Sequence, residues 1–164
     1  MDYYAVVVGA GPAGLSTSRE LGRRGIDHVV LERGEALGHT WAHLYDSLVL
    51  HTGKHLSSLP GLPFPRTTRL FPSRHDFLHY LHEYARRFGL PVRAHAEVEA
   101  IERADGRWSV RTRGGGELTA YVDRCELALG DSEYNRIELE TLGFPSTGVL
   151  PVVPDFAHLR VVPD

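Results

Sequence analysis

The first thirty residues alternate between apolar runs and a glycine-rich break. Residues 3–8 are apolar and β-branched on consecutive positions, which predicts a strand covered on both faces in a parallel sheet. Residues 12–24 then predict a helix, with Pro12 in its first turn and Gly25 at its C-terminal cap. The apolar pattern resumes over residues 28–31. A strand, a glycine turn, a helix and a second strand within about 30 residues predict a βαβ unit.

The middle of the chain contains a long aperiodic segment and then a clear amphipathic helix. Residues 33–68 are rich in Gly, Pro, His and Ser, and connections of this length are usually functional or disordered. Ser73 followed by Asp76 predicts a variant of the capping box, and an apolar stripe predicts a helix that ends before Gly89. The stripe consists of Phe77, Leu78, Leu81, Tyr84, Ala85 and Phe88.

Three short β-type runs follow, over residues 98–102, 108–112 and 118–122. Their alternation and the Asp105-Gly106 turn predict an antiparallel meander. Residues 126–129 are predicted to re-enter the parallel sheet as a last strand. We therefore expect an α/β, Rossmann-like domain over residues 1–130, with a parallel sheet and an inserted antiparallel β-meander. The proline-rich residues 131–164 have the character of a linker.

Composition narrows the class of protein without changing this fold. The chain of 164 residues is 42% hydrophobic and 24% charged, as expected for one globular domain. With 18 basic and 21 acidic residues the net charge is −3, so we expect no nucleic-acid partner. No apolar stretch approaches the length of about 20 residues that spans a bilayer, and no signal-peptide pattern is present. A single cysteine, Cys125, fits a reducing compartment, so we expect a cytoplasmic protein that does not bind membranes.

The strongest chemical signal is the series Gly9, Gly11 and Gly14 between the first strand and the first helix. This spacing provides a tight turn, a close backbone approach to a pyrophosphate and close packing of helix on strand. Glu32 follows the second strand, where a carboxylate can accept hydrogen bonds from ribose hydroxyls. An acid there disfavours a 2′-phosphorylated ribose, so NADP is a poor ligand for this site. Spacing alone leaves FAD and NAD both open.

Other side chains carry weaker signals. His75, His79 and His82 share one face of the predicted helix, but no fourth ligand accompanies them. A solvated histidine face therefore fits better than a metal site, and we predict none. Trp41 and Tyr45 suit two interpretations equally well: stacking on a ligand, or anchoring the long loop to the core.

Resemblance to a known family favours one of the two dinucleotides, FAD and NAD. Residues 7–15, then Leu31-Glu32-Arg33, Gly38 and Trp41, resemble the FAD-binding opening of flavin-containing monooxygenases. Residues 45–51, 59–65, 71–73 and the helix around residues 80–85 are similar to the branch with the plant YUCCA-type indole-pyruvate monooxygenases and bacterial relatives. The resemblance covers about residues 4–130, with several motifs in the same order.

The resemblance implies a two-domain enzyme in which one domain holds FAD, a second holds NADPH, and oxygen is activated at the flavin to oxygenate a small organic substrate. It places the glycine turn at the FAD pyrophosphate, Glu32 at the ribose, Arg33 near the adenosine, and residues 38–41 and 50–52 beside the flavin. It assigns no catalytic side chain, because the cofactor carries the chemistry. The expected cofactor-binding residues are Gly9, Gly11, Pro12, Ala13, Gly14, Glu32, Arg33, Gly38, Thr40, Trp41, His51 and Thr52.

The chain also departs from the family. It has Gly38-His39 in place of paired glycines, and Ala128-Leu129-Gly130 in place of Ala-Thr-Gly. The F-x-G-x-x-x-H-x-x-x-[YF] signature falls on residues 146–156 and matches only at Gly148 and Phe156. The second glycine motif, which binds NADPH in the family, is missing. We therefore expect a truncated or split monooxygenase-like oxidoreductase that depends on an external reductase or on a partner with an NADPH domain. The alternative is a non-catalytic FAD- or NAD-binding module that serves in assembly.

Overall fold

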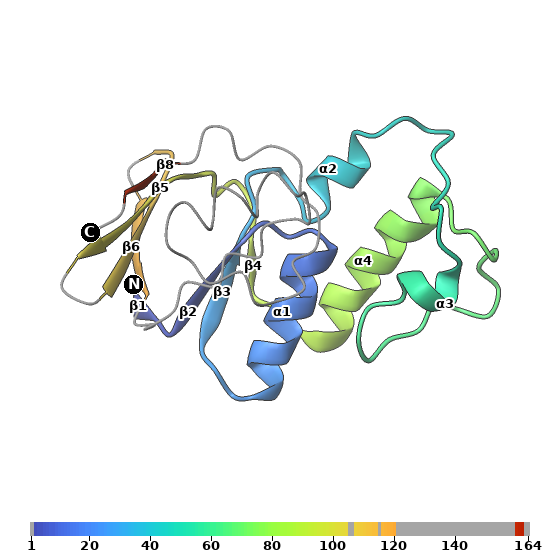
Figure 1. Cartoon of the computed structure of the whole chain (residues 1–164), viewed down its shortest axis with the longest axis horizontal. Coiled ribbons are helices and arrows are strands. Elements are labelled where there is room, and N and C mark those ends of the chain that lie inside the picture. Colours follow the sequence, from blue (N-terminus) through green and yellow to red (C-terminus); the bar gives the residue numbers. More distant parts are fainter. Residues whose placement is uncertain (1, 105–106, 115, 121–159, 163–164) are drawn as a thin grey trace.

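The structure is a computed structural model that describes residues 2–104, 107–114, 116–120 and 160–162. A three-stranded parallel sheet occupies its middle, with two long helices on one side and a five-stranded sheet on the other (Figure 1). Within these described ranges, every helix is too short or too polar to cross a membrane.

The parallel sheet has the order β2-β3-β4, with β2 at Ala5–Val8, β3 at His28–Leu31 and β4 at Val92–Arg93. Helix α1, Pro12–Arg23, connects β2 to β3, so the predicted βαβ unit is confirmed. The helix ends as predicted, because Gly25 adopts a φ of 69° and lets Ile26 N donate to the Leu21 carbonyl oxygen at 3.0 Å. Strand β4 was not predicted, since it has only two residues and follows a proline.

Strand β3 is apolar throughout because its two faces enter two different cores. Val30 lies in the core formed with α1 and with α4 (Arg74–Phe88), whereas Val29 and Leu31 lie in the core shared with the five-stranded sheet. Side chains alternate between the faces of a strand, so such a position needs consecutive apolar residues. His28 takes the helix side, where its Nδ1 and Nε2 are each 2.8 Å from a partner, the Ile26 carbonyl oxygen and the Ser18 hydroxyl.

The first apolar run is divided, contrary to the single covered strand that its sequence predicts. Strand β1, Asp2–Tyr3, pairs with the five-stranded sheet, and β2 pairs with β3. Between them, Tyr4 N and Ala5 N both donate to the Asp27 carbonyl oxygen, at 3.1 and 3.2 Å. Two successive amides on one acceptor break the regular ladder, and Tyr4 is left 65% exposed.

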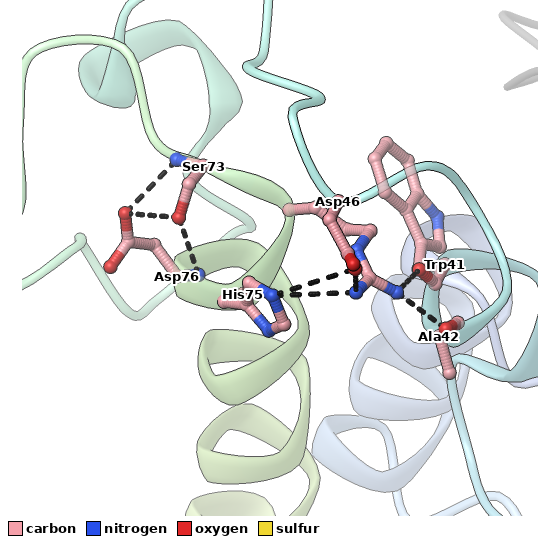
Figure 2. A network of polar contacts seen from close by, with 7 residues as sticks. Trp41, Ala42, Asp46, Ser73, His75 and Asp76 are labelled. Atoms are coloured by element: carbon pink, nitrogen blue, oxygen red, sulfur yellow. Dashed lines mark hydrogen bonds and ion pairs between the residues drawn. The ribbon is translucent and has the colours of Figure 1, made fainter.

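Helix α4 has both ends that the sequence predicts. The Ser73 hydroxyl accepts from Asp76 N, and the Asp76 carboxylate accepts from Ser73 N at 2.9 Å (Figure 2). The Ser73 hydroxyl also donates to the Asp76 carboxylate at 2.7 Å, and this hydrogen bond, together with that from Ser73 N, holds the pKa of Asp76 below its usual value. At the other end Gly89 adopts a φ of 59°, which caps the helix. The capping box is therefore confirmed.

The predicted antiparallel meander is confirmed over β5 (Val98–Ala104), β6 (Arg107–Thr112) and β7 (Gly116–Ala120). The full sheet has the order β1-β7-β6-β5-β8, because β1 pairs with β7 in parallel and β8 (Arg160–Val162) pairs with β5 in parallel. Strand β8 lies within the segment expected to be a linker. The expected strand at residues 126–129, Cys125 and the signature at residues 146–156 lie outside the described residues. The division at residue 130 remains a prediction.

The long aperiodic segment is held by side chains that bind its backbone carbonyls. It contains two single-turn helices, α2 at His39–Ala42 and α3 at Lys54–Ser57. The Lys54 ammonium donates to the carbonyl oxygens of Pro65, Arg66 and Thr68, at 3.2, 2.9 and 2.6 Å. One cation thus satisfies three acceptors that have no strand or helix partner.

Two tyrosines of α4 hold the next part of this segment. The Tyr80 hydroxyl donates to the Leu62 carbonyl oxygen at 2.6 Å and accepts from Leu59 N at 2.7 Å. The Tyr84 hydroxyl donates to the Pro60 carbonyl oxygen at 2.8 Å. Burial raises the pKa of Tyr80, and it raises the pKa of Tyr84 to about 12. Both phenols therefore stay neutral donors near neutral pH, as these carbonyl contacts require.

The packing of α1 on β2 generates a stability prediction. A Cβ atom on Gly14 would lie 1.9 Å from the Gly9 carbonyl oxygen, so an alanine cannot fit without moving the helix or the turn. We expect Gly14→Ala to lower the free energy of unfolding by about 3 kcal/mol. Gly22→Ala in the same helix is the matched control, since its Cβ meets only His28 Cε1 at 3.7 Å, and we expect it to be neutral or slightly stabilising. Urea unfolding of the two variants measures the difference, and equal stabilities would contradict the prediction.

Candidate nucleotide-binding site

The glycine turn joins β2 to α1 at the carboxyl edge of the parallel sheet. Gly9 adopts a φ of 95°, and its N–H donates to the Leu31 carbonyl oxygen at 2.7 Å. Gly11 is the N-cap residue of α1, and a Cβ atom added to it would meet no heavy atom within 4 Å. Gly14 packs against Gly9 as described above. The first and third glycines thus shape the turn, whereas space is open above the second.

The N-terminus of α1 has the features of an anion site. No side chain caps it, no acidic residue lies in its first turn, and Pro12 stands at the start, where its missing N–H costs nothing. Helix α4, by contrast, is capped by Ser73 and Asp76. The first amides and the dipole of this twelve-residue helix can therefore serve a phosphate group. These features fit the pyrophosphate of a dinucleotide.

Glu32 connects the two loops that follow β2 and β3. Its side chain is buried, with the residue 7% exposed, and its oxygens accept from Ala10 N at 2.9 Å and from Gly34 N at 2.8 Å. A carboxylate offers about four acceptor positions, so these two amides leave capacity for ribose hydroxyls. The structure thus gives Glu32 a role in shaping the site, and its contact with a ribose stays a prediction. Arg33, the next residue, is exposed at the same edge.

Gly38 brings α2 to the glycine turn. Its N–H donates to the Ala10 carbonyl oxygen at 3.0 Å, its φ is 70°, and a Cβ atom on it would lie 2.8 Å from Leu78 Cδ1. A glycine is therefore strongly favoured at this position. The residue that replaces the family's second glycine, His39, lies against Gly34, where an added Cβ would be 2.2 Å from the His39 ring.

The other predicted site residues are divided between two places. Ala13 is buried behind the glycine turn, and Thr40 and Trp41 lie half-buried on α2. His51 and Thr52 are exposed, and the Thr52 hydroxyl lies 2.7 Å from the Ser57 hydroxyl of α3. Figure 1 shows α3 on the side of α4 that faces away from the sheet. The structure thus gathers the glycine turn, Glu32 and α2, whereas residues 51–52 belong to the α3 region.

The two aromatic candidates, Trp41 and Tyr45, lie in different surroundings. The Trp41 ring packs edge-on against Phe77 of α4, with 4.4 Å between ring centroids. It therefore anchors α2 to the core, the second of the two interpretations. Tyr45 is 63% exposed. Among the described residues, no group of three or more His, Cys, Asp or Glu is arranged to hold a metal ion.

Sequence reasoning missed three contributors to this region. The amides of Ala10 and Gly34 bind Glu32, and no side-chain signal could identify them, because the bond uses backbone atoms. Arg74 contacts the end of α2 and carried a usable signal: a basic residue at the first position of a helix opposes the helix dipole.

These features define an α/β, Rossmann-like domain with a candidate dinucleotide site at the carboxyl edge of the parallel sheet. The chain belongs to the pyridine nucleotide-disulphide oxidoreductase family, whose model matches residues 6–131.

The most similar proteins include flavin monooxygenases. Indole-3-pyruvate monooxygenase YUCCA1 of Oryza sativa subsp. japonica is 44% identical over 119 residues, which are 71% of this chain and 29% of that protein. Flavin-containing monooxygenase from Stenotrophomonas maltophilia is 32% identical with a TM-score of 0.68, over 74% of this chain and 37% of that one. An oxidized steroid monooxygenase bound to NADP is 27% identical with a TM-score of 0.68, over 73% and 25% of the two chains. The resemblance to flavin-containing monooxygenases is confirmed, and the chain spans about 29% of the length of the rice relative.

The two acceptor roles of Glu32 generate a prediction. In Glu32→Gln an NH₂ group replaces one carboxylate oxygen. Whichever way the side chain turns, this NH₂ group faces the N–H of either Ala10 or Gly34, so two buried hydrogen-bond donors face each other without an acceptor. We expect the free energy of unfolding to fall by about 2 kcal/mol. The exposed neighbour Glu35 provides the control, Glu35→Gln, which should change stability by less than about 0.5 kcal/mol. Thermal and urea unfolding of both variants test this prediction. A Glu32→Gln variant as stable as the wild type would show that the two hydrogen bonds to Glu32 contribute little to the stability of the fold.

Proposed function

We propose that this chain is the FAD-binding part of a flavin-dependent, monooxygenase-like oxidoreductase. The observation that carries the proposal is the uncapped N-terminus of α1 behind the open position at Gly11, next to the buried Glu32. The likeness to YUCCA1 and to the bacterial flavin-containing monooxygenase supports FAD over NAD as the ligand. A cytoplasmic location is part of the same proposal, since one cysteine in 164 residues suits a reducing compartment.

Each part of the site has a separate task in this proposal. The first amides of α1 and the glycine turn, with Pro12 and Ala13, bind the pyrophosphate, and Glu32 orients the ribose while it holds the turn. Arg33 lies near the adenosine, and α2 with Gly38, Thr40 and Trp41 borders the flavin. His51 and Thr52 are proposed to border it as well, from the α3 region. Bound FAD would supply oxygen activation, and the protein would supply binding, orientation and exclusion of water.

The reductant and the substrate form a further part of the proposal. Because the chain spans about 29% of the rice relative, we propose that a nicotinamide site is supplied by further polypeptide or by a separate reductase. The steroid monooxygenase with bound NADP supports NADPH as the reductant. The substrates of that enzyme and of the rice protein, a steroid and indole-3-pyruvate, support a small organic substrate. The alternative is a non-catalytic FAD-binding module that serves in assembly.

FAD binding can be separated from folding by a glycine variant. We expect the purified chain to bind FAD and to show the visible absorption of oxidised flavin. In Gly11→Ala the added methyl group meets no protein atom, so the fold should be unchanged, but the methyl group occupies the space above the turn. We expect its affinity for FAD to fall about tenfold or more while its melting temperature stays that of the wild type without FAD. Fluorescence titration gives the affinities, and a wild-type chain that cannot be loaded with FAD would refute the proposal.

Turnover distinguishes the enzyme from the module. The FAD-loaded chain is mixed with NADPH and a flavin reductase, and candidate amines, sulfides and keto acids are added in turn. We expect an oxygenated product that mass spectrometry detects, above the level in a control with reductase and free FAD alone. Bound flavin without product from any candidate would favour the non-catalytic module.

A further inference from the structure

Arg74 is a buried cation at a position where helix physics disfavours one. It is the first residue of α4, at the end where the helix dipole is positive, and its side chain is only 8% exposed. Burial of a guanidinium and its placement at a helix N-terminus are both unfavourable unless its donors are bound elsewhere. The residue is therefore held in place by contacts outside its own helix.

Those contacts lie at the C-terminal end of α2 (Figure 2). One Arg74 nitrogen, Nη1, donates to the carbonyl oxygen of Ala42 and lies 3.4 Å from that of Trp41. The other, Nη2, donates to the Asp46 carboxylate and lies 3.3 Å from Nε2 of His75. The last carbonyls of a helix have no partner within it, so the guanidinium acts as a C-terminal cap on α2.

The other end of α2 is attached to the glycine turn. Gly38 N donates to the Ala10 carbonyl oxygen at 3.0 Å, and Ala10 N is bound by Glu32. A single helical turn is not stable by itself in water, because nucleation of a helix is unfavourable. The position of α2 therefore depends on contacts outside it: the glycine turn at its start, Arg74 at its end, and Phe77 beneath the Trp41 ring.

We propose that Arg74 is a positioning residue for bound FAD: it holds α2 against the glycine turn and so fixes Thr40 and Trp41 beside the flavin. This inference rests on the proposed FAD site. Asp46 is 86% exposed and His75 is 69% exposed, so solvent weakens their contacts with Arg74. The two carbonyls of α2 are the contacts that carry the effect.

The guanidinium is suited to this task by its shape. Its nitrogens lie in one plane and reach the α2 carbonyls and a carboxylate at the same time, whereas a lysine ammonium is a single point charge. We therefore compare Arg74→Lys, which keeps the charge, with Arg74→Met, which keeps only the length. Arg87→Met is the matched control, since Arg87 is an exposed arginine in the last turn of the same helix.

Three readouts are taken on the full chain. Fluorescence titration gives the Kd for FAD, visible circular dichroism reports the asymmetric surroundings of the bound flavin, and hydrogen exchange without FAD reports the amides of residues 39–46. We expect Arg74→Met to raise the Kd about tenfold, to change the visible spectrum and to speed exchange in residues 39–46. Arg74→Lys should show smaller changes of the same kind, and Arg87→Met should match the wild type.

The outcomes separate this inference from the proposed function. If the wild type does not bind FAD, both fail. If the wild type binds FAD and Arg74→Met shows the wild-type Kd and visible spectrum, or unchanged exchange in residues 39–46, the positioning role is overturned and the FAD site stands. If Arg74→Met loses the far-ultraviolet spectrum of the folded chain, Arg74→Lys decides by the same criteria.

Discussion

The buried carboxylate of Glu32 is the interaction on which the candidate site depends. Its oxygens bind the amides of Ala10 and Gly34, which belong to the loops after β2 and β3. Ala10 in turn accepts the N–H of Gly38, so the start of α2 is attached to the same point. Backbone groups in irregular segments must find partners when they are buried, and one acidic side chain here supplies partners to two loops. The glycine turn, the end of β3 and α2 therefore form one connected unit.

The same physical requirement explains how the long segment between β3 and α4 is ordered. Its carbonyl oxygens are bound by Lys54, Tyr80, Tyr84 and Arg74, in place of a strand or helix ladder. Three of these four side chains come from α4, a helix with strong caps at both ends. A regular helix thus supports an irregular segment, and Arg74 at its start binds the carbonyl oxygens at the end of α2. Precise placement of a binding loop by a rigid element is a common arrangement in proteins.

The location of the site follows from sheet geometry. In parallel strands the carboxyl ends meet at one edge, so the turn after β2 and Glu32 after β3 lie together although α1 and β3 separate them in sequence. Close contact of Gly14 with Gly9 then aims the N-terminus of α1 at this edge. The two hydrophobic cores on either side of β3 hold the sheet in position. Helix caps act within a few residues and could not do this alone.

The sequence by itself determined those features whose chemistry is local. The glycine spacing, the capping box of Ser73 and the glycine that ends each long helix act within a few residues, so the βαβ unit, α4 and the meander were predicted and confirmed. Tertiary structure decided the division of the first strand at Tyr4, the existence of β4, the backbone partners of Glu32 and the contact of Arg74 with α2. Apart from Gly34, which lies two residues from Glu32, each of these joins backbone groups to partners distant in sequence. Such pairing is set by how the elements pack, and no local pattern encodes it.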